Sequence, residues 1–373
     1  MLDSNRGPSF DYRRGFVRIG AVSIFAIGGP VIFAGKGLES LIYYLVSLAL
    51  LRLLSALAVS GVAKSNPSLA LLSYRVSPIW IVASALTPWF SNHLFESSIL
   101  LMPILSGVYL GSYWTLHFDV SQCLNRTTED YQFTEVISGL AGALLGVSLS
   151  VISGTDVAVA VGGAFVLCGI FFPLGIDSQE FEAQLSDWTR EAEERPREDI
   201  INGLKIVAGV AVLNWTCLST LRIETLVGVS PILGVVSLGI ALSASEAIGY
   251  WLTRDIGIEN GRFKLLACGF ALFGFALMTL GGPILAGGGY WFTSISSRVY
   301  WRVFDRKVAR AALRGLGGRP GSREIRRYSI SLACCPLLAY PDILPYIGIG
   351  SVILLITTRN SISPLKKGVS VKI

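Results

Sequence analysis

The chain has 373 residues, of which 52% are hydrophobic and 15% charged, and its mean hydropathy is +0.60. A soluble globular domain carries roughly 25% charged residues, so this chain has too few charges to cover a surface that faces water on all sides. The composition therefore excludes an ordinary soluble enzyme, a disordered chain and a disulfide-rich secreted module. It indicates a protein that crosses a membrane several times.

Apolar runs separated by charge, proline or glycine follow one another along the whole chain. A transmembrane helix needs about 20 mostly apolar residues, and the runs predict an all-α integral membrane protein with twelve transmembrane helices. Arg13, Arg14 and Arg18 lead directly into the first run, which argues against a cleavable signal peptide. The predicted spans are 15–35, 40–62, 68–90, 96–116, 134–154, 156–176, 202–221, 228–251, 263–280, 282–300, 325–341 and 343–358.

The positions of the basic residues predict the orientation of these spans. With twelve spans and a cytoplasmic N-terminus, the outer loops hold only Lys36 and Arg222, and Arg52 falls within a span. The other 28 of the 31 lysines and arginines lie in or beside cytoplasmic segments, as the positive-inside rule requires. We therefore expect both termini in the cytoplasm. The net charge of +6 fits contact with membrane lipids, and we expect no nucleic-acid partner.

One long hydrophilic segment divides the chain into two halves. Residues 177–199 contain nine acidic residues and three arginines, whereas the rest of the chain is basic. The division predicts a six-helix bundle over 1–176, an acidic cytoplasmic linker over 177–199 and a second six-helix bundle over 200–373. This six-plus-six organisation resembles the major facilitator superfamily of secondary transporters.

The loop between the eighth and ninth spans carries a second resemblance to that superfamily. Gly249, the pair Arg254-Asp255 and the pair Gly261-Arg262 resemble its cytoplasmic signature, although Arg254 precedes Asp255 and the interval to Gly261 is longer. The resemblance implies that Asp255 and Arg262 take part in gating. It also implies secondary transport by a protein of major-facilitator-like fold, which we expect to be a monomer.

Shorter stretches add to this resemblance. The corresponding loop of the first half keeps only Gly61 and Lys64. Residues 113–119, which close the fourth span, and residues 322–325, which open the eleventh, resemble an uncharacterised prokaryotic branch of the superfamily. The resemblance implies a location in the prokaryotic inner membrane.

Two charged residues inside predicted spans are the first candidates for function. A charge inside the bilayer costs about 2.5–3.5 kcal/mol on insertion scales, so each such residue is a functional hypothesis. Arg52 lies near the middle of the second span, where its planar guanidinium suits an anionic solute, and the alternative is a structural ion pair. Glu246 lies in the eighth span, where it suits proton coupling, and the alternative is a structural pair with a basic residue.

Polar and aromatic residues within the spans complete the predicted site. We expect Tyr44, Asn214 and Tyr290 to contact the solute, although tyrosines near span ends also anchor helices at the membrane surface. Trp114 and His117 lie one helical turn apart at the end of the fourth span. They suit a pH-sensitive gate, and the alternative is an interfacial helix cap.

Glycines predict where helices pack closely. Gly139, Gly142 and Gly146 form a small-residue face on the fifth span, which allows another helix to approach.

Three classes of function fit this pattern. The first is a secondary transporter that moves a small solute by alternating access, with no metal and no cofactor. The second is a non-transporting member of the same fold that acts as a membrane assembly or sensing partner. The third is a membrane-embedded enzyme, for which Asp119, Glu129 and Asp130 are the only candidate acids near the membrane face, without the spacing of metal ligands. We favour the first and do not expect an enzyme.

Overall fold

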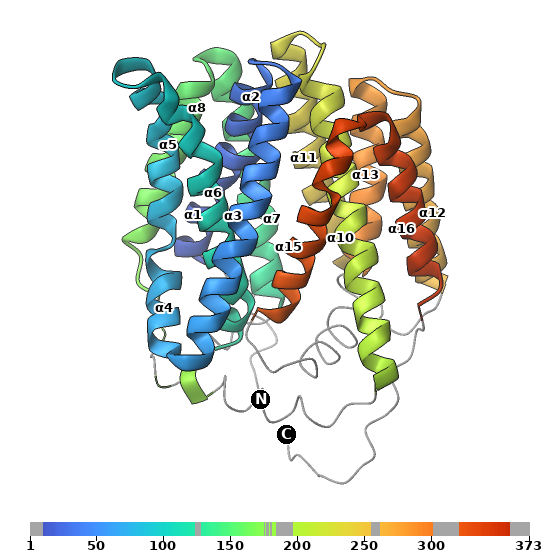
Figure 1. The fold of residues 1–373 in the computed structure, drawn as a ribbon, viewed down its shortest axis with the longest axis horizontal. Helices are drawn as coiled ribbons and strands as arrows, with labels where there is room; N and C mark the ends of the chain where they lie inside the picture. The colour runs from blue at the N-terminus through green and yellow to red at the C-terminus, as the bar shows by residue number, and fades with distance from the viewer. Residues whose placement is uncertain are drawn as a thin grey trace.

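The computed structural model describes residues 10–123, 128–174, 176, 179, 181–183, 197–254, 262–300 and 321–358, and within these ranges the chain forms helices and no strand. The helices run nearly parallel to one another between two ends (Figure 1). We call the end at which α1 begins the lower end and the end at which α2 finishes the upper end.

The helices up to residue 170 form what we call the first helix group. It consists of α1 (Tyr12–Ala21), η1 (Val22–Gly28), α2 (Gly29–Ala34), α3 (Leu38–Ser65), α4 (Pro67–Val76), α5 (Pro78–His93), η2 (Glu96–Leu100), α6 (Leu101–Cys123), α7 (Thr128–Ile152) and α8 (Thr155–Ile170).

The helices from residue 197 onward form the second helix group. It consists of α10 (Arg197–Leu226), α11 (Pro231–Arg254), α12 (Arg262–Thr279), α13 (Pro283–Tyr300), α15 (Ser322–Cys334), η4 (Cys335–Ala339), η5 (Pro341–Ile343) and α16 (Leu344–Ile356).

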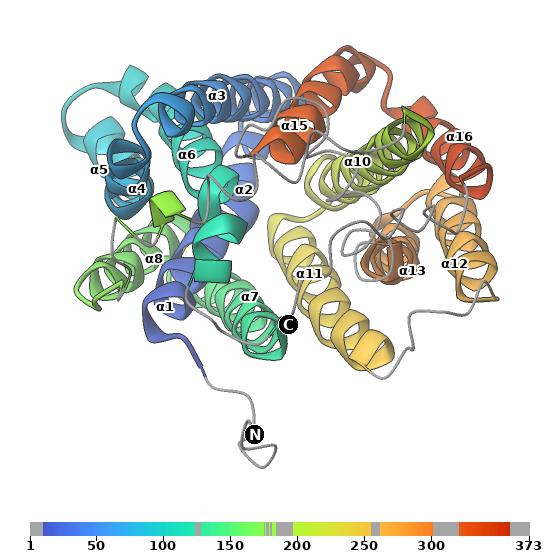
Figure 2. The same cartoon turned by 90° about the horizontal axis from the view of Figure 1, so that it is seen from below.

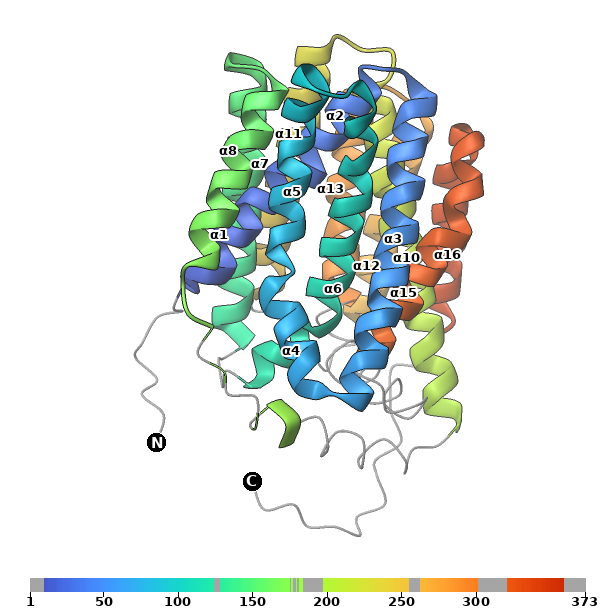
Figure 3. The same ribbon diagram turned by 60° about the vertical axis from the view of Figure 1, so that its left-hand side comes forward.

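The two groups lie side by side (Figure 2). Where they meet, α7 packs along α11, α3 packs against α15, and η1 and α2 contact α11 and α10. One apolar core lies around Tyr44 and Tyr109 of the first group and extends to Ile223 and Leu338 of the second, and another lies around Phe275 and Tyr300 within the second group. The side view shows the helices of both groups spanning the same height (Figure 3).

Helical segments occur at all twelve predicted spans, but they differ in length. Seven helical segments of the described ranges are long and apolar enough to cross a membrane: Tyr12–Ala34, Leu38–Ser65, Pro67–His93, Glu96–His117, Phe133–Ile152, Gly203–Leu226 and Pro231–Leu252. Three shorter apolar segments occupy Thr155–Ile170, Lys264–Thr279 and Pro341–Ile356. The count of twelve crossings therefore stays a prediction. Most of the predicted linker over 177–199 lies outside the described residues.

The predicted end of the seventh span is wrong. We placed its end at residue 221 and Arg222 in an outer loop, because a charge usually marks the end of an apolar run. In the structure α10 continues to Leu226, and Arg222 lies within it with 5% of its surface exposed. The helix continues because Leu221, Ile223 and Thr225 on either side of Arg222 are buried as well.

The first membrane helix changes geometry halfway along. α1 begins where the Asp11 side chain accepts a hydrogen bond from the backbone N–H of Arg14 (3.2 Å). From Val22 to Gly28 the chain forms a π-helix, whose hydrogen bonds run from residue i to i+5, and then returns to α-helical geometry at Gly29–Pro30. Such π segments are rare and often lie at functional sites.

The glycine face predicted on the fifth span packs against this first helix. A Cβ on Gly142 would lie 2.5 Å from the carbonyl oxygen of Ile19, and a Cβ on Gly146 would lie 3.1 Å from the Ser23 hydroxyl. Glycine therefore lets the backbones of α7 and α1 approach closely, as small residues do between membrane helices.

We expect Gly142→Ala to lower the apparent melting temperature of the purified protein, because the new methyl group would meet a backbone oxygen that cannot move aside. Overpacking of this kind costs about 1–3 kcal/mol. Gly61→Ala is the matched control, since a Cβ there meets nothing within 4 Å. Equal melting temperatures for the two variants would contradict the close packing of α1 and α7.

Candidate functional site

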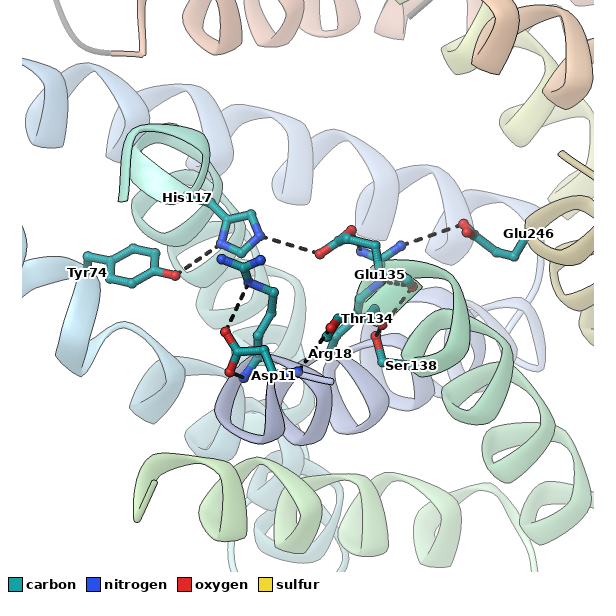
Figure 4. A network of polar contacts seen from close by, with 9 residues as sticks. Asp11, Arg18, Tyr74, His117, Thr134, Glu135, Ser138 and Glu246 are labelled. Atoms are coloured by element: carbon teal, nitrogen blue, oxygen red, sulfur yellow. Dashed lines mark hydrogen bonds and ion pairs between the residues drawn. The ribbon is translucent and has the colours of Figure 1, made fainter. Parts of the chain in front are cut away.

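A carboxylate at the lower end joins the two helix groups. Glu246 on α11 lies 3.6 Å from Nη2 of Arg18, which comes from α1 in the first group, and it pairs through its other oxygen with Arg298 on α13. One acidic side chain is thus shared by two arginines on opposite sides of the interface. The contact between Arg18 and Glu246 is shown in Figure 4.

Arg18 also belongs to a network within the first group. Its Nη1 lies 2.9 Å from the Glu135 carboxylate, and its Nε donates to the Glu135 backbone carbonyl (2.9 Å). Its guanidinium carbon lies 5.4 Å from the centre of the Trp114 ring. Arg18 is therefore held by α7 and α6 while it reaches across to α11.

His117 extends the network away from the interface (Figure 4). Its Nε2 lies 3.4 Å from the Glu135 carboxylate, and its Nδ1 lies 3.0 Å from the Tyr74 hydroxyl. An ionised carboxylate only accepts hydrogen bonds, so Nε2 carries the hydrogen and Nδ1 of the neutral ring accepts from Tyr74. The alternative that His117 caps the end of its helix is wrong, because α6 continues to Cys123 and His117 is 1% exposed. Its role in gating stays a prediction.

Two glycines leave room for these side chains. A Cβ on Gly139 of α7 would lie 3.4 Å from both the Arg18 guanidinium and the Glu246 carboxyl carbon. A Cβ on Gly249 of α11 would overlap the Arg298 side chain. Gly249 thus leaves space for the Arg298 side chain to reach Glu246.

Solvent reaches part of the network. The side chains of Glu246 and Arg298 are 23% and 29% exposed, whereas that of His117 is 1% exposed. Glu246 is therefore open to water, and to protons, at the junction between the groups, whereas His117 is sealed within the first group.

A second polar cluster lies near the upper end, around the backbone carbonyl of Phe25 in η1. In an α-helix this carbonyl would accept from the N–H of Gly29, and in a π-helix from the N–H of residue 30. Here the Gly29 N–H donates to the Ile24 carbonyl instead, and residue 30 is a proline without an N–H. The Phe25 carbonyl accepts from the Tyr44 hydroxyl (3.0 Å) and from Nη2 of Arg222 (3.5 Å). It therefore links α3 of the first group to α10 of the second.

Tyr290 on α13 lies between the two clusters. It is within electrostatic range of both Glu246 and Arg222, and Arg222 is within the same range of Tyr44. Three residues predicted from sequence, Tyr44, Tyr290 and Glu246, therefore each interact electrostatically with another member of this set or with Arg222. Their roles stay predictions.

Arg52, the predicted anion ligand, lies elsewhere on α3. Its guanidinium carbon is 3.9 Å above the ring of Tyr328 on α15, a cation–π contact between the two groups. Arg327 is within electrostatic range of it. Asn214 lies half-buried on α10, where its backbone carbonyl oxygen accepts a hydrogen bond from the Cys217 thiol (3.3 Å).

Other predicted residues fall partly or wholly outside the description. Asp255 lies outside the described residues, and of Arg262 the structure gives the backbone at the start of α12. The side chains of Asp119, Glu129 and Asp130 also lie outside it. Across the described ranges, no three histidine, cysteine, aspartate or glutamate residues come together in a way that could hold a metal ion.

Sequence reasoning missed four residues of the two clusters: Arg18, Glu135, Arg298 and Arg222. The first three stand close to the predicted span ends, where a charge needs no special explanation. The burial of Arg222 within a helix could have been predicted, because the apolar run resumes beyond it. The sequence Gly28-Gly29-Pro30 was a second signal, since a proline within a span leaves a carbonyl without its helical donor.

Comparison with solved structures identifies the fold. The chain is similar to the D-xylose-proton symporter (TM-score 0.59, 12% identity, 96% of this chain and 98% of that one). It is also similar to a variant of the Escherichia coli fucose:proton symporter FucP (0.54, 12%, 94% and 98%) and to the nucleoside transporter NupG (0.54, 13%, 94% and 98%).

No protein-family model and no curated protein matches the sequence. At this identity the likeness shows the fold, and the chain has the fold of the major facilitator superfamily. Together with its apolar helices, that fold makes it a multi-pass integral membrane protein.

We expect Arg18→Gln and Glu135→Gln to be coupled in their effect on stability. Each single change removes the nearest counter-charge of the remaining partner, so each lowers the apparent melting temperature. The double variant should lose less than the sum of the two, by a coupling of about 1 kcal/mol or more. Arg18→Gln combined with a change at the exposed Glu39 should be additive, and an additive Arg18–Glu135 pair would show that this contact is not formed.

Proposed function

We propose that this protein is a secondary active transporter that moves a small solute across a membrane by alternating access. In this mechanism two helix groups separate in turn at one end and then at the other. The observation that carries the proposal is the carboxylate of Glu246, shared between Arg18 of the first helix group and Arg298 of the second.

Glu246 suits proton coupling because its charge state controls a contact between the groups. While ionised, it attracts both arginines and favours a closed lower end. Protonation removes that charge, so the attraction across the interface weakens and the equilibrium shifts toward a state in which the groups separate. The partial exposure of Glu246 supports this role, because the proton must reach it from water.

The solute path in this proposal runs between the two clusters. Tyr44 and Tyr290 supply hydroxyl groups and aromatic surface, and Asn214 supplies an amide on α10. Arg52, on the α3–α15 contact, favours an anionic solute. Trp114 acts as a gating residue through its contact with Arg18.

The lower end faces the cytoplasm in this proposal, because most lysines and arginines fall in segments at that end. Both termini then lie in the cytoplasm of a prokaryotic cell, and the protein works as a monomer among lipids of the inner membrane. Residues 1–176 and 200–373 form the two halves, joined by the acidic linker. Asp255 and Arg262 belong to the gating loop at the same end.

Transport is measured on purified protein in vesicles that contain a pH-sensitive dye. The first solutes are D-xylose, fucose and a nucleoside, after which the three structural neighbours are named, followed by small organic anions. We expect one class of solute to carry protons inward, seen as acidification of the vesicle interior.

Glu246→Gln should abolish the proton flux and leave solute counterflow, since exchange does not require the proton to be released. Glu39→Gln is the matched control, an exposed glutamate away from the network, and should behave like the unaltered protein. Proton-driven uptake that survives Glu246→Gln would overturn the coupling role. No flux of any solute would instead favour the assembly or sensing partner.

A further inference from the structure

Within the described part of the chain, Arg222 is a buried cation without a counter-charge. It is 5% exposed, its Nε has no hydrogen-bond partner among the described residues, and its Nη2 makes a long contact of 3.5 Å to the Phe25 carbonyl. A buried charge is costly unless it is paired. No carboxylate of the residues that the structure describes forms an ion pair with Arg222.

The acidic residue nearest to Arg222 in the sequence, Glu224, accepts a hydrogen bond from another part of the chain. Glu224 lies two residues further along α10, which places it on a different face of the helix. Its Oε2 accepts the backbone N–H of Gly282 (2.8 Å) in the turn between α12 and α13. Gly282 has a positive φ of 86°, so this carboxylate stabilises a turn that glycine makes possible. Glu224 therefore serves the fold of the second helix group.

The partner that Arg222 does have is a weak and replaceable one. The Phe25 carbonyl is neutral, and it is already satisfied by the Tyr44 hydroxyl at 3.0 Å. A guanidinium prefers an oxyanion, because charge-assisted and bidentate hydrogen bonds are roughly twice as strong as neutral ones. A carboxylate or phosphate that reaches Arg222 would displace the carbonyl.

Aromatic hydroxyl side chains surround Arg222. Gly29 has no side chain, and a Cβ there would lie 2.6 Å from Cζ of Tyr44, so glycine admits the tyrosine ring beside the Phe25 carbonyl. Tyr290 on α13 interacts electrostatically with Arg222. Two tyrosines and the arginine thus come from three helices that belong to both groups.

We propose that Arg222, with Tyr44 and Tyr290, is the site that binds the oxyanion group, a carboxylate or a phosphate, of the transported solute. The Phe25 carbonyl holds Arg222 in place while the site is empty. This inference rests on the proposed function and names the class of its substrate. It assigns that recognition to Arg222, while Arg52 stays on its tyrosine at the α3–α15 contact.

Binding of oxyanions is tested on the purified full chain by isothermal titration calorimetry. The probes are benzoate, its neutral counterpart benzamide, and inorganic phosphate. Chloride salt is added so that the ionic strength is the same in every titration. We expect benzoate or phosphate to bind and benzamide not to bind. Arg222→Met should weaken the binding at least tenfold, and Arg222→Lys, which keeps the charge but loses the planar fork, should weaken it less.

A second readout separates binding from folding. If Arg222 is retained for a ligand, removing its uncompensated charge should not destabilise the empty protein, so Arg222→Met should melt at the same or a higher temperature. A lower melting temperature would show that Arg222 holds the fold together, which would overturn the proposal. Benzoate or phosphate binding that survives Arg222→Met, or that is lost in Arg52→Gln instead, would also overturn it.

The outcomes separate this inference from the proposed function. If neither benzoate nor phosphate binds the unaltered protein, while a neutral sugar or nucleoside drives proton flux into vesicles, the oxyanion site is wrong and the transporter stands. If the oxyanion binds but no solute drives flux, the site stands and the transport proposal fails.

Discussion

The structure depends on one ionic contact, the carboxylate of Glu246 held between Arg18 and Arg298. Charges that lie among apolar helices need partners, and these three side chains satisfy one another only where the two helix groups touch. The features around them follow from that requirement. Gly139 and Gly249 lie against the arginine side chains, and Glu135 forms an ion pair with Arg18 within the first group. His117 in turn contacts Glu135 from the interior of the first group and is itself hydrogen-bonded to Tyr74.

The two ends of the molecule are closed by contacts of different strength. At the lower end the groups are joined by ionised side chains, which water can reach and a proton can weaken. At the upper end they are joined through a neutral carbonyl that a π-helix and a proline leave without its own donor, and the partner is an arginine at the outer limit of hydrogen-bond distance. In the proposed mechanism a proton acts on the first contact and an oxyanion on the second. Each end would then have its own switch, as alternating access requires of two interfaces that must not open together.

Much of the architecture follows from hydropathy, because each predicted span coincides with a helical segment and the glycine face of the fifth span does pack against the first. The resemblance to the major facilitator superfamily is confirmed at the level of fold. The site was harder to predict. A charge within an apolar run marks either a helix end or a residue inside the helix. For Arg222 we predicted a helix end, whereas it lies within α10. The partners of Glu246 were out of reach of sequence patterns, because Arg18, Glu246 and Arg298 lie on three helices whose juxtaposition only the packing of the two groups determines.

Distances between spin labels across the two groups test the central account most directly. One pair, at Leu72 on α4 and Leu265 on α12, reports on the lower end, and a second pair, at Ile152 on α7 and Ile284 on α13, reports on the upper end. All four side chains are exposed, so labels there disturb little. If Glu246 holds the lower end closed, Glu246→Gln lengthens the lower distance while the upper one does not lengthen, as acidification of the unaltered protein should. Two distances that stay unchanged by both treatments would contradict the account.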